Sequence, residues 1–277
     1  MENENFTVCM SVYKKDHPHY FKCAVDSIVN QSIPPAQIVL VVDGPVSEKL
    51  DEVIINYDTN LDYLKVIRLQ DNMGRAVSRQ IGIENADYEL IAIMDSDDIS
   101  LSDRFEKQLK EFRTDQSIDV VGGQITEFIG DVNNIVGKRE VPIEYAHIKK
   151  YIKLRNPMNF VTVMMKKSAV MKAGGYKGYF GEEDYFLWVR MLMNDCVFKN
   201  LTDNLVNVRV GKEMYSRRGG IDFYKRDIRL QRYIYGCGLI TFSLYLYSIV
   251  LRFFVEVIFS NSMRGWFYRN FLRRKNV

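Results

Sequence analysis

The sequence is poor in the residues that mark several specialised classes of protein. It contains only 6 proline, 17 glycine and 4 cysteine residues in a chain of 277. These numbers give no support to a collagen-like chain, a low-complexity chain or a scaffold held by disulfides. Hydrophobic residues make up 47% of the chain, which is enough for a sizeable core and argues against disorder.

Two further absences concern metal binding and targeting. The cysteines are Cys9, Cys23, Cys196 and Cys237, and none forms a Cys-x-x-Cys pair, so we expect reduced thiols, mostly in the core, and no zinc site. The N-terminus lacks the basic start and long apolar stretch of a secretory signal. We therefore expect a cytoplasmic protein.

Positive charge is scarce in most of the chain and gathers at its end. The net charge is +3, and the residues from Arg252 onward include six Lys or Arg against one acid, Glu256. A nucleic-acid-binding domain would spread basic residues over its folded face, so that class is excluded. A basic tail favours an anionic membrane surface, with a solvated terminus as the alternative.

No apolar run is long enough for a comfortable membrane span. Residues 236–251 are uncharged, but these sixteen residues fall short of the about 20 that a transmembrane helix needs. Beyond Ser262, aromatic and basic residues interleave, which suits a helix lying in the membrane interface. Those residues are Arg264, Trp266, Phe267, Tyr268, Arg269, Phe271, Arg273, Arg274 and Lys275. A C-terminal helix packed on the protein core is the alternative.

What the chain does contain is a regular alternation of strand and helix patterns. Expected strands cover 6–13, 37–42, 64–69 and 89–94, and expected helices cover 17–31, 47–57, 74–85 and 102–112. The alternation fades after about residue 115, where we expect strands over 119–129, 160–165 and 196–201 and helices over 142–154 and 183–194. The pattern predicts an α/β fold with a mainly parallel sheet flanked by helices.

Carboxylates follow three of the first four expected strands. They are Asp43, Asp71 and Asp95. A single Asp after a strand is most often a turn or cap residue. Ligands of such sheets, however, bind outside the carboxyl ends of the strands, so three carboxylates at one edge predict a binding site there.

The strand over 90–94 leads into a tight turn that holds Asp95, Asp97 and Asp98. Carboxylates so close together repel one another unless a cation joins them. Hard oxygen ligands suit Mg²⁺ or Mn²⁺, and Mg²⁺ usually takes one or two protein carboxylates together with substrate phosphates. The turn therefore predicts a metal–diphosphate site.

Acidic or phosphate-binding turns also occur in unrelated kinds of site. A calcium-binding EF-hand is excluded because Ile99 and Ser100 replace an oxygen ligand and the turn glycine. The glycine-rich motifs of phosphate-loop and dinucleotide sites are absent. A haloacid-dehalogenase-type phosphatase with Asp95 as nucleophile stays open, although its motif normally opens the domain and here three strand–helix units precede it.

An ordered set of motifs along nearly the whole chain resembles the inverting family 2 glycosyltransferases of the GT-A fold, the bacterial polysaccharide-assembly type. The matching pieces are the strand at 8–13, Asp43-Gly44, Asn72-Met73-Gly74 with Arg75 and Arg79, the turn at 95–98, and Gly181-Glu182-Glu183-Asp184 ahead of Trp188 and Arg190. Each motif alone is weak, but the ordered set is specific.

The resemblance implies how a nucleotide-sugar donor is bound. Tyr13 and Asp43 would hold the base and ribose, and Arg75 would lie near the base. Asp95 would contact the nucleoside, and Asp97 would ligate Mg²⁺ or Mn²⁺. The charge chemistry agrees, because a metal offsets negative charge that builds on the leaving diphosphate.

The resemblance also implies a catalytic base and an acceptor side. Asp184 matches the family's base, which takes the proton of the acceptor hydroxyl. The alternative is that the acids at 182–184 only complement the helix dipole. Residues 156–159 resemble an acceptor-side segment in which relatives often carry a His, but Phe160 and Val161 follow here, and His147 is too far along the chain to replace it. Arg217-Arg218 fits either a lid or a solvated loop.

Together these features predict an inverting, Mg²⁺- or Mn²⁺-assisted transferase that moves a hexose or N-acetylhexosamine from a nucleotide sugar, with UDP-sugar preferred. The expected acceptor is a polyprenyl-diphosphate-linked saccharide of O-antigen, capsule or exopolysaccharide synthesis, reached at the inner face of the cell membrane. We expect a nucleotide-sugar-binding half at 1–115, an acceptor and base half at 116–235, and a membrane-associating segment at 236–277. The alternatives are the phosphatase and a non-catalytic membrane-associated scaffold.

Overall fold

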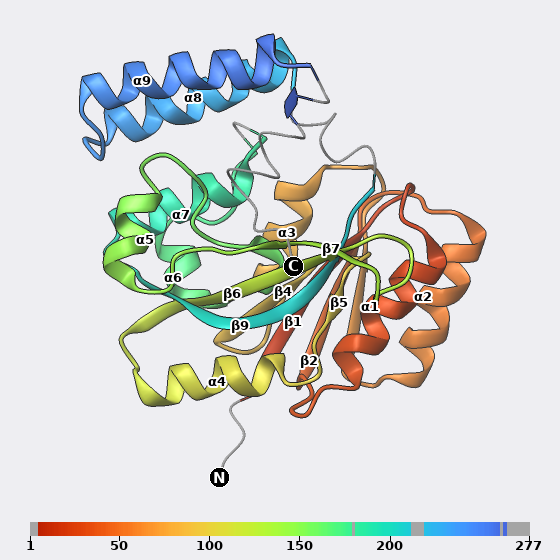
Figure 1. Ribbon diagram of the computed structural model, residues 1–277. Helices are drawn as coiled ribbons and strands as arrows, with labels where there is room; N and C mark the ends of the chain where they lie inside the picture. Colours follow the sequence, from red (N-terminus) through yellow and green to blue (C-terminus); the bar gives the residue numbers. More distant parts are fainter. Residues whose placement is uncertain (1–4, 179–180, 212–218, 261–262, 265–277) are drawn as a thin grey trace.

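The first half of the chain folds into the expected strand–helix units (Figure 1). The computed structural model describes residues 5–178, 181–211, 219–260 and 263–264. The strands are β1 (Phe6–Val12), β2 (Gln37–Val42), β3 (Leu64–Arg68) and β4 (Leu90–Met94), and the helices are α1 (Pro18–Val29), α2 (Glu48–Asn60), α3 (Arg75–Glu84) and α4 (Arg104–Thr114). The strands pair in parallel in the order β3-β2-β1-β4. Helices flank the sheet, so β2 and β4 are buried along their whole length.

The second half extends the same sheet with strands that run in both directions. They are β5 (Ile99–Ser100), β6 (Ile118–Phe128), β7 (Ile135–Arg139), β8 (Met164–Lys166) and β9 (Val197–Arg209). β8 lies antiparallel between β4 and β6, β6 and β9 are parallel, and β5 and β7 add antiparallel edges. The described strands form one nine-stranded sheet, parallel as predicted from β3 to β4 and mixed beyond β4. Three helices accompany them, α5 (Tyr145–Tyr151), α6 (Lys167–Lys172) and α7 (Glu183–Met193).

Two of the predicted strands differ from the structure in extent. The strand expected over 160–165 begins with a 3-10 turn, Phe160–Thr162, and only β8 is extended. The Thr162 hydroxyl donates to the Asn159 carbonyl at 2.7 Å, and such local bonds compete with a strand ladder. The short strand expected over 196–201 continues as β9 to Arg209, because long-range pairing with β6 carries it past a polar stretch.

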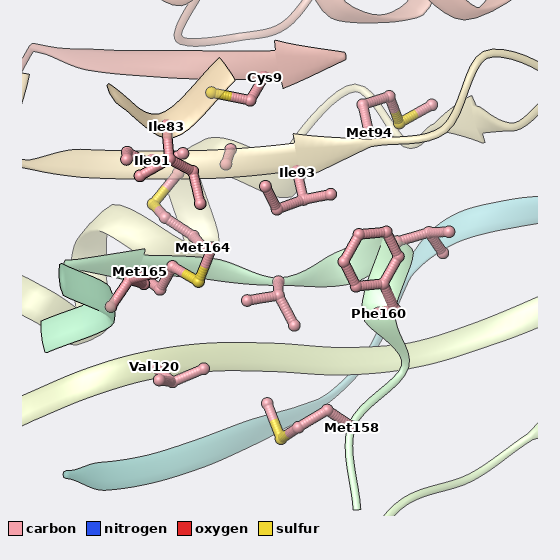
Figure 2. Packing of buried hydrophobic residues seen from close by; sticks show 14 of the residues in the cluster. Cys9, Ile83, Ile91, Ile93, Met94, Val120, Met158, Phe160, Met164 and Met165 are labelled. Atoms are coloured by element: carbon pink, nitrogen blue, oxygen red, sulfur yellow. The ribbon is translucent and has the colours of Figure 1, made fainter. Parts of the chain in front are cut away.

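Methionine and aliphatic side chains fill the core between β4, β8 and β6 (Figure 2). Met164 and Met165 are fully buried, and Met94 lies near Phe160 at the other end of this layer. Cys9 is buried in the same cluster, and burial raises the pKa of its thiol to about 12. All four cysteines are free, as expected; Cys9 and Cys196 are buried, and the other two are partly exposed.

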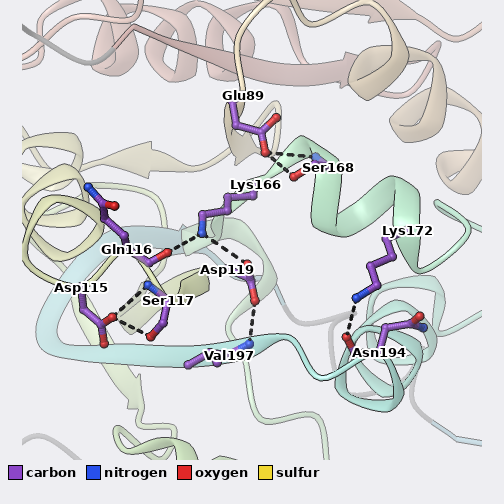
Figure 3. A network of polar contacts seen from close by, with 10 residues as sticks. All are labelled: Glu89, Asp115, Gln116, Ser117, Asp119, Lys166, Ser168, Lys172, Asn194 and Val197. Carbon is purple, nitrogen blue, oxygen red and sulfur yellow. Dashed lines mark hydrogen bonds and ion pairs between the residues drawn. The ribbon is translucent and has the colours of Figure 1, made fainter.

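Polar contacts fix β8 at the end of the sheet that lies away from the Asp95 turn (Figure 3). Lys166 Nζ donates to the Gln116 carbonyl at 2.7 Å and lies 3.4 Å from Asp119 Oδ1. Asp119 Oδ2 in turn accepts a hydrogen bond from the Val197 amide at 2.9 Å. These bonds join β6, β8 and β9 at the end of the sheet opposite the Asp95 turn.

The C-terminal part of the described chain is a helical hairpin at one end of the molecule (Figure 1). It consists of α8 (Ile221–Gly236), α9 (Phe242–Arg252) and a π-helix, Phe253–Ile258. The hairpin thus begins at Ile221, ahead of residue 236, where the sequence suggested that the last segment starts. Among the described residues, no helix combines the length and apolar character needed to cross a bilayer.

The structure corrects the expected role of Arg264. Its side chain is only 4% exposed and donates to the carbonyls of Val255, Glu256 and Phe259 at 2.9 to 3.1 Å. Carbonyls at a helix end lack partners within the helix, and a guanidinium satisfies several at once. Arg264 is therefore not available to lipid. The remaining aromatic and basic residues of the predicted tail, 265–277, lie outside the described residues.

Candidate functional site

Asp43, at the end of β2, shapes a loop at the carboxyl edge of the sheet. Its Oδ1 accepts a hydrogen bond from the Met73 amide at 2.7 Å, and its Oδ2 accepts one from the Gly74 amide at 3.0 Å. Gly44 has a φ of +82°, and a Cβ there would lie 2.7 Å from the Asn72 nitrogen. The Asp43-Gly44 and Asn72-Met73-Gly74 motifs therefore pack against each other and position the start of α3. The Asp43 carboxylate, in a residue only 5% exposed, holds this loop.

The Asp95 turn gathers a fourth carboxylate that was not predicted from the sequence. Asp16, just after β1, accepts hydrogen bonds from Ser96 Oγ at 2.9 Å and from the Tyr13 amide at 3.0 Å. Lost hydration, together with the charges of Asp95 and Asp16, raises the pKa of Asp97 to about 6, although Asp97 still reaches solvent. The signal in the sequence was a fourth acid after a strand, Tyr13-Lys14-Lys15-Asp16.

Asp98 faces inward and ties the turn to β9. Its Oδ1 accepts a hydrogen bond from the Arg209 amide at 2.8 Å. Burial and then the charges of Asp97 and Asp95 raise the pKa of Asp98 well above its ordinary value. The Arg209 guanidinium lies 3.9 Å from the ring centre of Tyr20 and donates to the Asp97 carbonyl at 3.1 Å. Arg209 was not predicted, because only the fold brings the end of β9 to this turn.

The acids of this turn fit a divalent cation that is shared with a substrate. Within the described ranges, no group of three or more His, Cys, Asp or Glu side chains is placed to hold a metal by itself. Mg²⁺ commonly uses one or two protein carboxylates and fills its other positions with water and phosphate oxygens. Asp97 is exposed, and the Asp95 side chain is 38% exposed, so both can reach such a ligand.

A buried arginine joins this turn to the start of α7. Arg79 Nη2 lies 3.4 Å from Asp95 Oδ1, and Arg79 Nη1 donates to Glu183 Oε1 at 2.8 Å. We call Asp95, Arg79 and Glu183 the Arg79 bridge. Burial opposes the charge of Arg79, but the surrounding acids Asp95, Glu183 and Asp184 raise its pKa overall. Arg75, whose side chain is 69% exposed, also reaches Glu183 Oε1, at 3.1 Å.

Asp184 lies in the first turn of α7, beside the Arg79 bridge. Asn156 Nδ2 donates to its Oδ2 at 2.9 Å, and Asn156 Oδ1 accepts from the Met158 amide at 3.1 Å. Asp184 is half-buried, whereas Glu183 is 5% exposed. The neighbouring acids are therefore in different situations, because Glu183 is committed to two arginines and Asp184 is oriented by a neutral amide. Asn156 was predicted to lie on the acceptor side, but its bond to Asp184 was not predicted.

Phe160 occupies the segment in which relatives often carry a His, and its ring packs against the Arg79 bridge. Its ring centre lies 3.7 Å from the Arg79 guanidinium carbon, which is a close cation–π contact. His147 is exposed on α5 and has no place in these contacts. Tyr13 is 38% exposed at the end of β1. Arg217 and Arg218 lie outside the described residues.

Comparisons with known proteins agree with this architecture. Residues 7–180 match the family model for glycosyl transferase family 2. The chain is 31% identical, over 99% of its length and 98% of the relative's, to a UDP-Gal:alpha-D-GlcNAc-diphosphoundecaprenol beta-1,3-galactosyltransferase of Escherichia coli. It is 33% identical to the amylovoran biosynthesis glycosyltransferase AmsE of Erwinia amylovora, over 82% of this chain and 84% of that one.

A solved structure shares the fold. The TarS fragment 1–349 of S. aureus in complex with UDP-GlcNAc superimposes with a TM-score of 0.66 over 97% of this chain and 76% of that one, at 18% identity. The family match, the two relatives and the shared GT-A fold together show that this chain belongs to glycosyltransferase family 2.

Proposed function

We propose that this glycosyltransferase moves a hexose or N-acetylhexosamine from a UDP-sugar, with inversion, to a saccharide carried on a polyprenyl diphosphate. The observation that carries the proposal is the Arg79 bridge, which links the acidic turn after β4 to the helix that bears Asp184. In this proposal the donor-side acids lie at one end of the bridge and the candidate base lies beside its other end. Family membership leaves no support for a haloacid-dehalogenase-type phosphatase.

On the donor side, Tyr13, Arg75 and Asp95 are the proposed contacts of the nucleoside. Asp43 contributes mainly by holding the loop that leads to α3, since both of its carboxylate oxygens accept backbone hydrogen bonds. Asp97, supported by Asp95, would hold Mg²⁺ or Mn²⁺ with the diphosphate. Such a cation offsets the charge of the leaving nucleoside diphosphate.

Asp184 is the proposed general base. In a single inverting displacement, the acceptor hydroxyl attacks the anomeric carbon, its proton passes to a carboxylate, and the nucleoside diphosphate leaves on the opposite side. The amide of Asn156 holds one carboxylate oxygen, Oδ2, and leaves Oδ1 to accept the proton. The amino end of α7 favours a negative charge at this place.

The proposed acceptor is supported by the relatives. The E. coli relative is named for an acceptor linked to diphosphoundecaprenol. We propose an acceptor of this class in surface polysaccharide synthesis, with the enzyme peripheral on the cytoplasmic face of the membrane. In this scheme residues 1–115 bind the donor, 116–235 supply the acceptor side and the base, and 236–277 contribute to membrane association.

The test is a transfer reaction with a defined product. Purified protein is incubated with Mn²⁺, a panel of UDP-, GDP- and TDP-sugars and a synthetic diphospholipid-linked N-acetylglucosamine, and the product is analysed by mass spectrometry. We expect one added hexose or N-acetylhexosamine with a UDP-sugar. Asp184→Asn should transfer at least about a hundredfold more slowly with near-normal UDP binding. Hydrolysis of the donor with no sugar added to any acceptor would contradict the proposal.

A further inference from the structure

The helix α9 turns its polar side toward the protein. Ser248 is fully buried, and its hydroxyl donates to Gln231 Oε1 of α8 at 3.0 Å. One turn later, Arg252 Nε donates to Asp227 Oδ2 of α8 at 2.7 Å. One further turn on, Glu256 is only 4% exposed. The face that meets α8 therefore carries a hydroxyl, a guanidinium and a carboxyl group.

The opposite side of α9 and the π-helix is apolar and exposed. Its side chains recur every three or four residues, so they form one stripe along the helix. We call this stripe the outer face; it consists of Phe242 (61% exposed), Leu246 (51%), Tyr247 (57%), Val250 (48%), Leu251 (39%), Phe254 (51%) and Ile258 (56%). A surface helix in water normally keeps its exposed side polar, whereas the outer face carries apolar side chains.

Such a stripe indicates a non-aqueous neighbour. Fully burying a large apolar side chain contributes about 1.5 to 3 kcal/mol, and contiguous exposed patches of this kind mark interaction surfaces. The polar inner face also gives α9 a fixed orientation, because turning the stripe inward would expel Arg252 and Glu256 from their partners.

The charge of the C-terminal part of the chain favours an anionic partner. The exposed residues of α8 include four basic ones, Lys225, Arg226, Arg229 and Arg232, against one acid, Asp222. In sequence, residues 265–277 add three Arg and one Lys and no acid. An apolar stripe on a hairpin with an excess of exposed basic residues suits the boundary between the acyl chains and the headgroups of an anionic bilayer.

The hairpin is attached close to the acceptor side of the site. Arg252 Nη2 donates to the carbonyl of Leu154 at 2.8 Å. Leu154 lies two residues before Asn156, which holds Asp184. A surface that engages the outer face is thus connected through Arg252 to the segment that orients the proposed base.

We propose that the outer face of α9 and the π-helix docks in the interface of an anionic lipid bilayer and so presents the acceptor side of the site to lipid-borne substrates. The proposal extends the lipid-linked acceptor of the proposed function. It is tested without any sugar nucleotide, so its failure is distinguishable from a failure of the transferase assignment.

The experiment is vesicle flotation with the full-length protein. Leu246→Glu combined with Val250→Glu places two charges on the outer face. The matched control is Ile55→Glu combined with Val136→Glu, two apolar residues that are 51% and 45% exposed elsewhere. Vesicles containing phosphatidylglycerol are compared with phosphatidylcholine alone. We expect the wild type and the control to float with the anionic vesicles and the outer-face variant to bind at least about tenfold more weakly.

Three further outcomes are decisive. Equal flotation of the wild type and the outer-face variant overturns the proposal. The proposal is also overturned if the wild type does not bind vesicles but forms a dimer in light scattering, and the outer-face variant is a monomer. The outer face is then a contact between two copies of the chain. A chain truncated after Arg264 lacks the basic tail. If it retains part of the vesicle binding, the outer face contributes to that binding, which supports the proposal. Circular dichroism confirms that each variant is folded.

Discussion

At the scale of single residues, adjacent acids at the start of α7 have different tasks. Glu183 is buried and bonded to Arg79 and Arg75, whereas Asp184 is half-exposed and held by a single amide. The Glu183 carboxylate is committed to the contacts of the Arg79 bridge, whereas Asp184 has one carboxylate oxygen held by Asn156. The structure therefore gives a physical reason to separate the two residues, which the sequence alone placed together at a helix start.

The first prediction concerns Glu183. Glu183→Gln removes one charge of a buried ion pair, so we expect the free energy of unfolding to fall by about 3 kcal/mol. Urea denaturation measures this change. The matched variant is Asp184→Asn, which should leave the unfolding free energy nearly unchanged while transfer falls.

The opposite result would exchange the two roles. If Glu183→Gln were stable but inactive and Asp184→Asn remained active at saturating substrate, Glu183 would be the base. The Arg79 bridge would then contribute to catalysis and not to the free energy of unfolding.

A second prediction at this scale concerns Asp97. Asp97→Ala should abolish the increase in UDP affinity that Mn²⁺ produces, because an exposed carboxylate is lost from the proposed cation site. Calorimetry with and without Mn²⁺ measures the affinity. Asp103→Ala, another exposed acid just before α4, serves as the control and should keep the metal dependence. A variant at Asp97 with unchanged metal dependence would remove this residue from the site.

At the scale of elements, the contact between α8 and the π-helix that follows α9 contains a buried acidic pair, Asp227 and Glu256. Burial, with the charge and hydrogen bonding of Asp227, raises the pKa of Glu256 to about 9, and the cation of Arg252 opposes this rise. Glu256 therefore carries a proton at neutral pH in the folded protein. In the unfolded chain the same group would release its proton near its ordinary pKa of 4.5.

The stability of the hairpin should therefore depend on pH in a definite direction. Between pH 4.5 and about 9 the folded state holds a proton that the unfolded state has lost, so the free energy of unfolding contributed by Glu256 falls as pH rises through this window. Melting of the wild type at pH 6 and pH 8.5 should show the fall. Glu256→Gln replaces the protonated carboxyl group with an amide, which can still donate a hydrogen bond and does not titrate. This variant should show a smaller fall in stability between the two pH values. An equal pH dependence in both proteins would contradict the assignment.

At the scale of the whole molecule, the parallel and the mixed halves of the sheet both contribute residues to the candidate site. Its parallel strands bring Tyr13, Asp43 and Asp95 to one edge, and its mixed half brings β9 against the same turn through the bond between Arg209 and Asp98. The polar network around Lys166 fastens the other end of the sheet. The helical hairpin is attached next to the segment that orients Asp184, so the proposed donor, acceptor and membrane surfaces lie around one candidate site.

The sequence by itself determined the alternating strands and helices, the acids after the strands and the family. These features depend on local periodicity and on residues close together in the chain, such as the turn from Asp95 to Asp98. It also indicated an unusual C-terminus, since the uncharged run and the basic tail are visible without coordinates.

The tertiary structure alone decided the contacts between distant segments. Arg79 meets Glu183 across 104 positions, and Arg209 meets Asp98 across 111. Asp43 is part of the loop at Met73 and Gly74, and Arg264 caps a helix end where the sequence suggested a lipid contact. Periodicity carries no information about which distant side chains become neighbours, because chain packing selects those pairs when the apolar faces are buried together.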